Sequence, residues 1–417
     1  MNGQSFPFDE HPPSHVLESL IVSRSHRGHI QHTVSDPALI AKIIGHRKND
    51  YRQVSPHPLT SAWRRPPPPD QDSLVSCFDL LPVGVTVPVI ASAAAEAPAR
   101  WRKLGITEIN AQAEAACVSF DVVSQALFSS DPAVSGADTL MSLSSILEHR
   151  AADKDKGRRL WPSFRMRPQR VVSDLATTQI REQLTRMLAA RLDDPGRPND
   201  LVSNLLIAAA GKRAQTEATA ATISMAERLL LNGQIVGGRT LTRILALLIH
   251  HPDIQVRASR EAIAAAAQGP QDSFWRRTPY LRQIISEALR IYPLGKSIER
   301  VAIRNDALGG VEIRRGDRVV IWPAAIHRHR SLWANPDRFD PDNFTPERRD
   351  RLPPYQYLPF GIARSASIVE AYSVAQLATV LAVWLSQYRF APAQADIHSG
   401  WQPPNGDRLM MRILPIS

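Results

Sequence analysis

Cysteine is scarce in this sequence of 417 residues, which contains only Cys77 and Cys117. The two form no C-x-x-C motif and have no histidine at the spacing of a zinc site, which argues against a disulfide framework and favours a reducing compartment. A free cysteine usually packs as a small apolar side chain, so we expect both to be ordinary buried residues. The sequence also lacks a P-loop and a G-x-G-x-x-G motif, so neither pattern indicates a phosphate site.

Long apolar runs are missing as well. No stretch approaches the roughly 18 uninterrupted apolar residues of a membrane span. Residues 1–15 are polar, contain prolines and have no apolar centre, so no secretory signal is visible. We therefore expect a cytoplasmic protein without a membrane span, in which residues 1–15 are flexible.

Acidic residues are fewer than basic ones, 40 against 50, which gives a formal net charge of +10. The arginines are spread along the chain, so nucleic acid binding has little support, and we expect no nucleic-acid partner. The positive charge indicates solubility with weak attraction to polyanions, or a basic face for an acidic electron-transfer partner.

Helical periodicity dominates from about Val87 onward, after four consecutive prolines at 66–69 that no helix can contain. The apolar spacing and the turn residues predict helices over 106–128, 169–192, 219–251, 280–291 and about 368–387. After Pro293 the pattern changes, and residues 311–321 predict two short strands around a glycine turn. Without a repeat or a linker, residues 1–417 are predicted to form a single, mainly α domain with a small β subdomain.

The most specific pattern lies in the C-terminal half. Glu287 and Arg290 form an E-x-x-R pair, whose i,i+3 spacing places a carboxylate and a guanidinium on one face of a helix. Arg300, the predicted strands, the segment PDRFDP and the loop YLPFGIARSASIV follow in that order. This order and spacing resemble the cytochrome P450 superfamily of the soluble bacterial type, best over residues 229–390. The resemblance implies the P450 fold, a triangular prism of helices.

The resemblance also implies roles for individual residues. In this family the E-x-x-R pair and the arginine of the P-x-R-F segment form a buried, salt-bridged cluster. One glutamate can hold two guanidinium groups, which agrees with that arrangement. The implied architectural residues are Glu287, Arg290 and Arg338. The implied cofactor is haem, and the residues implied to contact it are Arg300, Phe360 and Arg364.

The loop that begins at Phe360 departs from the family pattern F-G-x-G-x-R-x-C-x-G. Counted without a gap, the cysteine position falls on Ser367 and the arginine position on Ser365. The flanking glycines become Ala363 and Val369. A cysteine thiolate is the axial ligand that favours O–O cleavage at haem iron, and a serine hydroxyl ionises far less easily. We expect Ser367 to occupy the metal-ligand position without ligating well.

Two further family elements are missing. The central helix of the family carries A-G-x-[DE]-T-T, and the matching segment here is NGQIVG. Its acid position is Ile235 and its alcohol position is Val236, and neither side chain can carry a proton. Thr240 and Thr242 lie a turn or more later, where a relay would be strained. The W-x-x-x-R motif that holds a haem propionate has its nearest match at Trp63, but a proline stands in place of its arginine.

These losses lead to our main hypothesis, a catalytically impaired or inactive P450-like protein that acts as a helper or docking protein for a biosynthetic enzyme. The alternative is a haem-dependent monooxygenase or oxidoreductase for a hydrophobic small molecule, with an unusual or absent thiolate ligand. In that case His327 or His329 could replace the cysteine. A monooxygenase of this family would take electrons from a ferredoxin-type partner. No sequence feature identifies a substrate.

Overall fold

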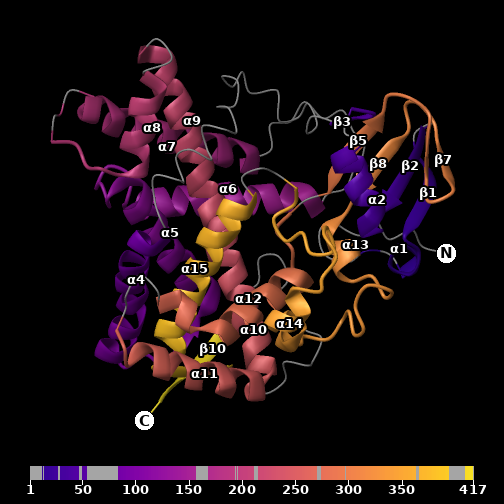
Figure 1. The fold of residues 1–417 in the computed structure, drawn as a ribbon. Helices are drawn as coiled ribbons and strands as arrows, with labels where there is room; N and C mark the ends of the chain where they lie inside the picture. Colours follow the sequence, from indigo (N-terminus) through magenta and orange to yellow (C-terminus); the bar gives the residue numbers. More distant parts are fainter. Residues whose placement is uncertain are drawn as a thin grey trace. The chain divides into compact units, whose positions relative to one another are not determined.

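The structure is a computed structural model that describes residues 12, 14–26, 29–46, 49–53, 83–155, 168–192, 194, 196–210, 215–269, 274–295, 297–362, 366–393 and 409–416. The chain divides into two compact units (Figure 1). We call the first the sheet unit, made of Met1–Arg64 and Ser286–Ala366. The second is the helical unit, made of Arg65–Ile285 and Ser367–Ser417.

A five-stranded sheet organises the sheet unit. Its strands, in spatial order, are β1 (Ile21–His26), β2 (His29–Val34), β8 (Arg318–Ile321), β5 (Ile298–Ala302) and β3 (Tyr51–Gln53). Only β2 and β8 run parallel, with Gln31 opposite Arg318, and the other neighbours are antiparallel. The chain thus brings strands from its first fifty residues beside strands that follow Pro293.

Short helices and a second ladder complete the sheet unit. They are α1 (Ser14–Glu18), α2 (Pro37–Ala41), η1 (Lys42–His46), α13 (Pro323–His327), η5 (Pro341–Phe344), α14 (Pro346–Arg349) and the pair β6 (Asp306–Leu308) and β7 (Val311–Ile313). The core contains Val34, Ile40, Val319 and Ile321, each fully withdrawn from solvent. Burial of such aliphatic side chains contributes about 1.5–3 kcal/mol each.

Long helices form most of the helical unit. They are α4 (Val83–Leu104), α5 (Ala111–Phe128), α6 (Ala137–Asp155), α7 (Pro168–Leu192), α8 (Leu201–Ala210), α9 (Gln215–Gly233), η3 (Gln234–Arg239), α10 (Thr240–His250), α11 (Pro252–Ala266), η4 (Phe274–Arg277) and most of α15 (Ala366–Leu385). A small sheet has the order β4 (Glu108–Asn110), β10 (Met410–Pro415) and β9 (Tyr388–Pro392). The helix α12 (Pro279–Ile291) passes from one unit into the other.

Aromatic packing links the small sheet of the helical unit to its helices. The rings of Trp101 and Trp384 meet edge to face, with centroids 5.2 Å apart, and the Trp101 ring meets Tyr388 in the same way at 5.4 Å. The indole N–H of Trp384 donates to the backbone oxygen of Ala94 over 2.9 Å, so the buried ring keeps its one polar group satisfied.

The predicted mainly α class with a small β part is confirmed, and the helices over 169–192 and 280–291 are found within one residue of their predicted bounds. The helix predicted over 106–128 begins at Ala111, because residues 108–110 form a strand and the Asn110 side chain accepts hydrogen bonds from two N–H groups of the first turn. The helix predicted over 219–251 is interrupted by the π-helical segment η3.

Two findings of absence concern the described residues alone. Within the described ranges, no helix is both long and apolar enough to cross a bilayer. The same ranges contain no cluster of three His, Cys, Asp or Glu residues suited to a metal ion. Cys117 is half-buried and not fully buried as expected, and burial raises the pKa of its thiol, which disfavours the reactive thiolate form. Cys77 lies outside the described residues.

Candidate functional site

The Glu287–Arg290 pair is a buried ion pair of the sheet unit. Both side chains are completely buried on α12. The Arg290 Nε donates to Glu287 Oε2 and its Nη2 donates to Oε1, each over 2.7 Å. This two-pronged contact is the geometry that a planar guanidinium offers to a carboxylate. The predicted pairing is therefore present.

The other donors of Arg290 hold the loop that follows α13. Its Nη1 donates to the backbone oxygens of His327, over 2.8 Å, and Pro336, over 2.6 Å. Its Nη2 also donates to the backbone oxygen of Arg338 over 2.9 Å. A guanidinium has five N–H donors, and all five are used here. One buried side chain thus fixes three points of the segment 327–338.

Arg338 takes part in this cluster differently from the expectation. Its side chain is exposed, and only its backbone oxygen contacts Arg290. Glu287 Oε1 instead accepts from the backbone N–H of Asp340 over 2.9 Å and from the Asn343 side-chain amide over 3.2 Å. These neutral donors fill the carboxylate sites that a second guanidinium would take, and they avoid the cost of burying a second cation.

His327 is the next buried group of the cluster. Its Nε2 lies 2.7 Å from the Leu358 N–H and therefore accepts a hydrogen bond, so Nδ1 carries the ring proton and donates to the Arg290 backbone oxygen over 3.2 Å. The ring stacks on Tyr357 with centroids 5.3 Å apart. Because both nitrogens are committed to the backbone, His327 ties α12 to the loop before Phe360 and has no lone pair for a metal.

Burial, with a contribution from the Arg290 cation, lowers the pKa of His327 to about 3. The unfolded chain has a histidine pKa near 6.5, so between these values the unfolded chain binds one more proton. The free energy of unfolding is therefore expected to fall by about 2 kcal/mol as the pH drops from 7 to 5. Urea unfolding at both pH values of the native chain and of His327→Gln measures this. Gln keeps a side-chain acceptor for the Leu358 N–H. The difference between the two proteins in how the free energy of unfolding changes with pH therefore gives the contribution of His327. Equal slopes would contradict the assignment.

The loop that begins at Phe360 is held by backbone contacts in the sheet unit. The backbone oxygen of Pro359 accepts from the N–H groups of Leu294, over 2.8 Å, and Gly295, over 2.7 Å. Gly361 has a φ of +78°, and a side chain at Gly295 would collide with the Gly361 backbone. Phe360 is half-buried in this loop. The close backbone contact requires glycine at both Gly295 and Gly361, and the sequence analysis did not identify Gly295.

The other predicted loop residues are described only in part. Arg364 and Ser365 lie outside the described residues. Ser367 lies in the first turn of α15, and its side chain is not among those described. The assignment of the family's cysteine position to Ser367 therefore stays a prediction from the sequence.

Arg300 is half-buried on β5. Its Nη1 donates a long hydrogen bond of 3.4 Å to the backbone oxygen of Glu299, and burial lowers the pKa of its guanidinium. In the part of the chain that the structure describes, no carboxylate pairs with it. A partly desolvated guanidinium with spare donors fits an anionic group such as a haem propionate. The serine at position 367 does not fit the thiolate ligation of the iron.

The segment that matches the family's proton relay forms η3 in the helical unit. Ile235 and Val236 are half-buried aliphatic residues of this π-helical turn. The Thr242 hydroxyl donates to the backbone oxygen of Gly238 over 2.8 Å, so its proton is already committed. The Thr240 hydroxyl is buried, and among the described residues it has no hydrogen-bond partner. A side chain at Gly237 would collide with the Ser119 hydroxyl, so α5 packs closely against this turn.

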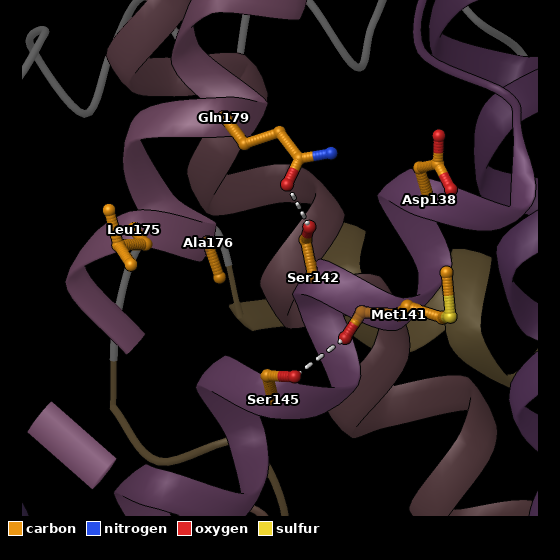
Figure 2. A pocket seen from close by; sticks show the side chains of 7 residues that line it. All are labelled: Asp138, Met141, Ser142, Ser145, Leu175, Ala176 and Gln179. Atoms are coloured by element: carbon orange, nitrogen blue, oxygen red, sulfur yellow. Dashed lines mark hydrogen bonds between the residues drawn. The ribbon is translucent and has the colours of Figure 1, made fainter. Parts of the chain in front are cut away.

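A pocket of about 450 Å³ lies between α6 and α7 (Figure 2). Its lining residues are Asp138, Met141, Ser142, Ser145, Leu175, Ala176 and Gln179. Figure 2 shows the hydroxyls of Ser142 and Ser145 already engaged, with Gln179 Oε1 over 3.2 Å and with the Met141 backbone oxygen over 3.0 Å. None of the residues predicted from the sequence lines this pocket, and it offers no activated nucleophile.

Comparison with known proteins gives one consistent family. The sequence profile of the family "Cytochrome P450" matches residues 84–403. Cytochrome P450 3A12 of Canis lupus familiaris is 25% identical over 224 residues, which are 52% of this chain and 44% of that protein. Thromboxane-A synthase of Mus musculus is 34% identical over 195 residues, which are 44% of this chain and 36% of that protein. The chain thus matches less than half of the length of these relatives.

Two solved structures resemble this chain over most of its length. The match to the cytochrome P450DA heme domain has a TM-score of 0.77 at 19% identity and covers 95% of this chain and 90% of that chain. The match to retinoic acid bound cyanobacterial CYP120A1 has a TM-score of 0.77 at 17% identity and covers 95% of this chain and 92% of that chain. The predicted P450 fold is therefore confirmed. The single domain over 1–417, the flexible residues 1–15, the best match over 229–390, the bacterial type and the cytoplasmic location stay predictions.

Proposed function

Since the chain belongs to the cytochrome P450 family, we propose that it is a catalytically impaired member that does not carry out thiolate-dependent oxygen activation. The observation that carries this proposal is Ser367 at the position of the family's cysteine. An alcohol oxygen remains protonated where a thiol readily ionises, and it is a poor electron donor to haem iron.

The residues at the proton-relay positions of the helical unit support the same proposal. The positions of the relay acid and alcohol hold Ile235 and Val236, which have no exchangeable proton. Thr242 donates within its own helix. The relay positions themselves therefore offer no proton to bound dioxygen, and the buried Thr240 hydroxyl lies one turn further along the helix, so we infer that two requirements of the reaction are lost, the ligand and the relay.

A histidine ligand is the main alternative, and the contacts of the two candidates argue against it. His327 uses both ring nitrogens on the backbone of the sheet unit. His329 Nδ1 accepts from the Ser331 N–H over 3.3 Å and lies 2.8 Å from the Ser331 hydroxyl. The neutral ring therefore carries its proton on Nε2, which is buried and has no hydrogen-bond partner among the described residues. A ring must turn a free lone pair to the metal in order to ligate it. We infer that neither residue replaces the cysteine.

Haem, if bound, would supply a redox-active iron, and the described residue best suited to hold a propionate is Arg300. The family resemblance adds Phe360 and Arg364 as proposed haem contacts. The fully satisfied contacts of Glu287 and Arg290 support a chain that still folds around this cluster. A maintained fold without the reactive groups suits a helper or docking protein for a biosynthetic enzyme, which is the role that we propose.

Turnover tests this proposal against a working monooxygenase. The purified chain is supplied with NAD(P)H, a reductase, a ferredoxin-type partner and a panel of hydrophobic small molecules. The expected result is no haem-dependent hydroxylation and no NAD(P)H oxidation above that of the redox partners alone. Substrate-dependent, haem-dependent hydroxylation at rates typical of enzymes, about 1 per second or more, would contradict it.

A further inference from the structure

Three polar side chains lie in a row across the sheet unit, and none of them is among the predicted site residues. Ser23 on β1 faces His32 on β2 as its direct cross-strand partner, and its Oγ lies 2.8 Å from the His32 Nδ1. The His32 Nε2 lies 3.2 Å from Oδ2 of Asp317, the residue before β8. Figure 1 shows the three strands side by side.

The line runs from the interior to the surface. The side chains of His32 and Asp317 are 2% and 8% exposed, whereas Ser23 is exposed to solvent. The Arg314 backbone N–H also donates to Asp317 Oδ2, over 2.8 Å. Burial alone would raise the pKa of Asp317, but the hydrogen bonds from Arg314 and His32 lower it. The carboxylate is therefore charged at neutral pH and acts as an acceptor.

The carboxylate decides which nitrogen of His32 carries the proton. An ionised carboxylate accepts only, so the His32 Nε2 must donate to it, and Nδ1 of the neutral ring is left with a lone pair. The Ser23 hydroxyl then donates its proton to Nδ1 and keeps its own lone pairs open to solvent. A nucleophile within hydrogen-bond reach of a base that a third group orients is the arrangement of an activated serine.

We propose that Ser23 is a nucleophile, with His32 as its general base and Asp317 as the positioning residue, and that it reacts with activated carboxylic esters. The Ser23 Oγ forms a bond to the acyl carbon, and its proton passes to His32 Nδ1. The bond from the acyl carbon to the leaving oxygen breaks, and the leaving group takes the electron pair and then the proton from His32. Water attacks the acylated serine in the same way and restores the hydroxyl.

The strand that carries Ser23 suits an ester ligand. In the described sheet β1 is an edge strand, so alternate backbone N–H groups point away from β2 and can donate to a carbonyl oxygen. The same strand supplies an internal control. Ser25 is exposed like Ser23, but its cross-strand partner is Ile30, which offers no base.

A fluorophosphonate probe tests the proposal, because it forms a stable adduct by the same attack: the Oγ–P bond forms, the P–F bond breaks, fluoride leaves and the proton passes to His32. The native chain is labelled, digested and analysed by mass spectrometry. We expect the adduct on Ser23 and at least about tenfold less on Ser25, the gain that a general base provides. His32→Gln is expected to lower the labelling rate of Ser23 by at least about tenfold, and Ser25→Ala to leave it unchanged.

The role of Asp317 is tested by its effect on the ring proton. In ¹⁵N NMR spectra of the native chain, His32 is expected to carry its proton on Nε2, and Asp317→Asn is expected to redistribute that proton while lowering the Ser23 labelling rate. The comparison of Ser23 with Ser25 within one native molecule needs no variant to fold. Equal labelling of the two serines, or none on Ser23, would overturn the proposal.

Discussion

Arg290→Met is expected to lower the free energy of unfolding by about 3–5 kcal/mol. The change removes one partner of a completely buried ion pair and leaves the Glu287 carboxylate without its counter-charge. It also removes the donors to the backbone oxygens of His327, Pro336 and Arg338. Arg290→Lys is expected to recover only part of this loss, because an ammonium has three donors and no planar fork.

Urea unfolding followed by circular dichroism measures the effect, with Arg338→Met as the matched control. Arg338 is exposed and contributes its backbone oxygen, which the substitution keeps. The control is therefore expected to lie within about 0.5 kcal/mol of the native chain, as exposed positions usually do. Similar losses in the two variants would show that the Arg338 side chain is part of the cluster after all.

Ser367→Cys is expected to give the second large effect, the appearance of thiolate-ligated haem. The substitution restores a side chain that ionises readily on a metal at the position where the family places its ligand. We expect the purified variant to retain more haem than the native chain, and its reduced carbon monoxide complex to show the red-shifted Soret band of thiolate ligation. Expression with added haem precursor, followed by absorption spectroscopy, measures both.

Ser365→Cys is the matched control for this experiment. It introduces the same thiol two residues earlier, at the position of the family's arginine in the ungapped alignment. The control is expected to show no such band. A band in Ser365→Cys alone would place the ligand position at residue 365 and would overturn the alignment from which the loss of the cysteine is inferred.

The sequence predicts the long helices and the E-x-x-R pair well, because apolar spacing and the i,i+3 relation are local properties of the chain. The strands β1 to β3 were missed. The strands β2 and β3 pair with β8 and β5, more than two hundred residues away, so local periodicity carries little information about them, and β1 pairs with β2 at the edge of the same sheet. The π-helical turn η3 was missed for a similar reason, since its close contact with α5 arises only in the packed fold.

Within the candidate site, the residue types were predicted better than their roles. A motif names Arg338 but cannot tell whether its guanidinium or its backbone oxygen makes the contact. His327 entered as a candidate metal ligand, and only the contacts of its two ring nitrogens identify it as a buried link between α12 and the loop before Phe360. No sequence motif identifies Asn343. Its side-chain amide donates a hydrogen bond to Glu287 from the short helix η5.

The absorption spectrum of the purified native chain, reduced with and without carbon monoxide, tests the loss of the thiolate ligand most directly. An alcohol at position 367 predicts little bound haem and no red-shifted Soret band in the carbon monoxide complex. A full haem complement with the thiolate-type band would contradict the account, because it would require a sulfur ligand that we have not found in this loop.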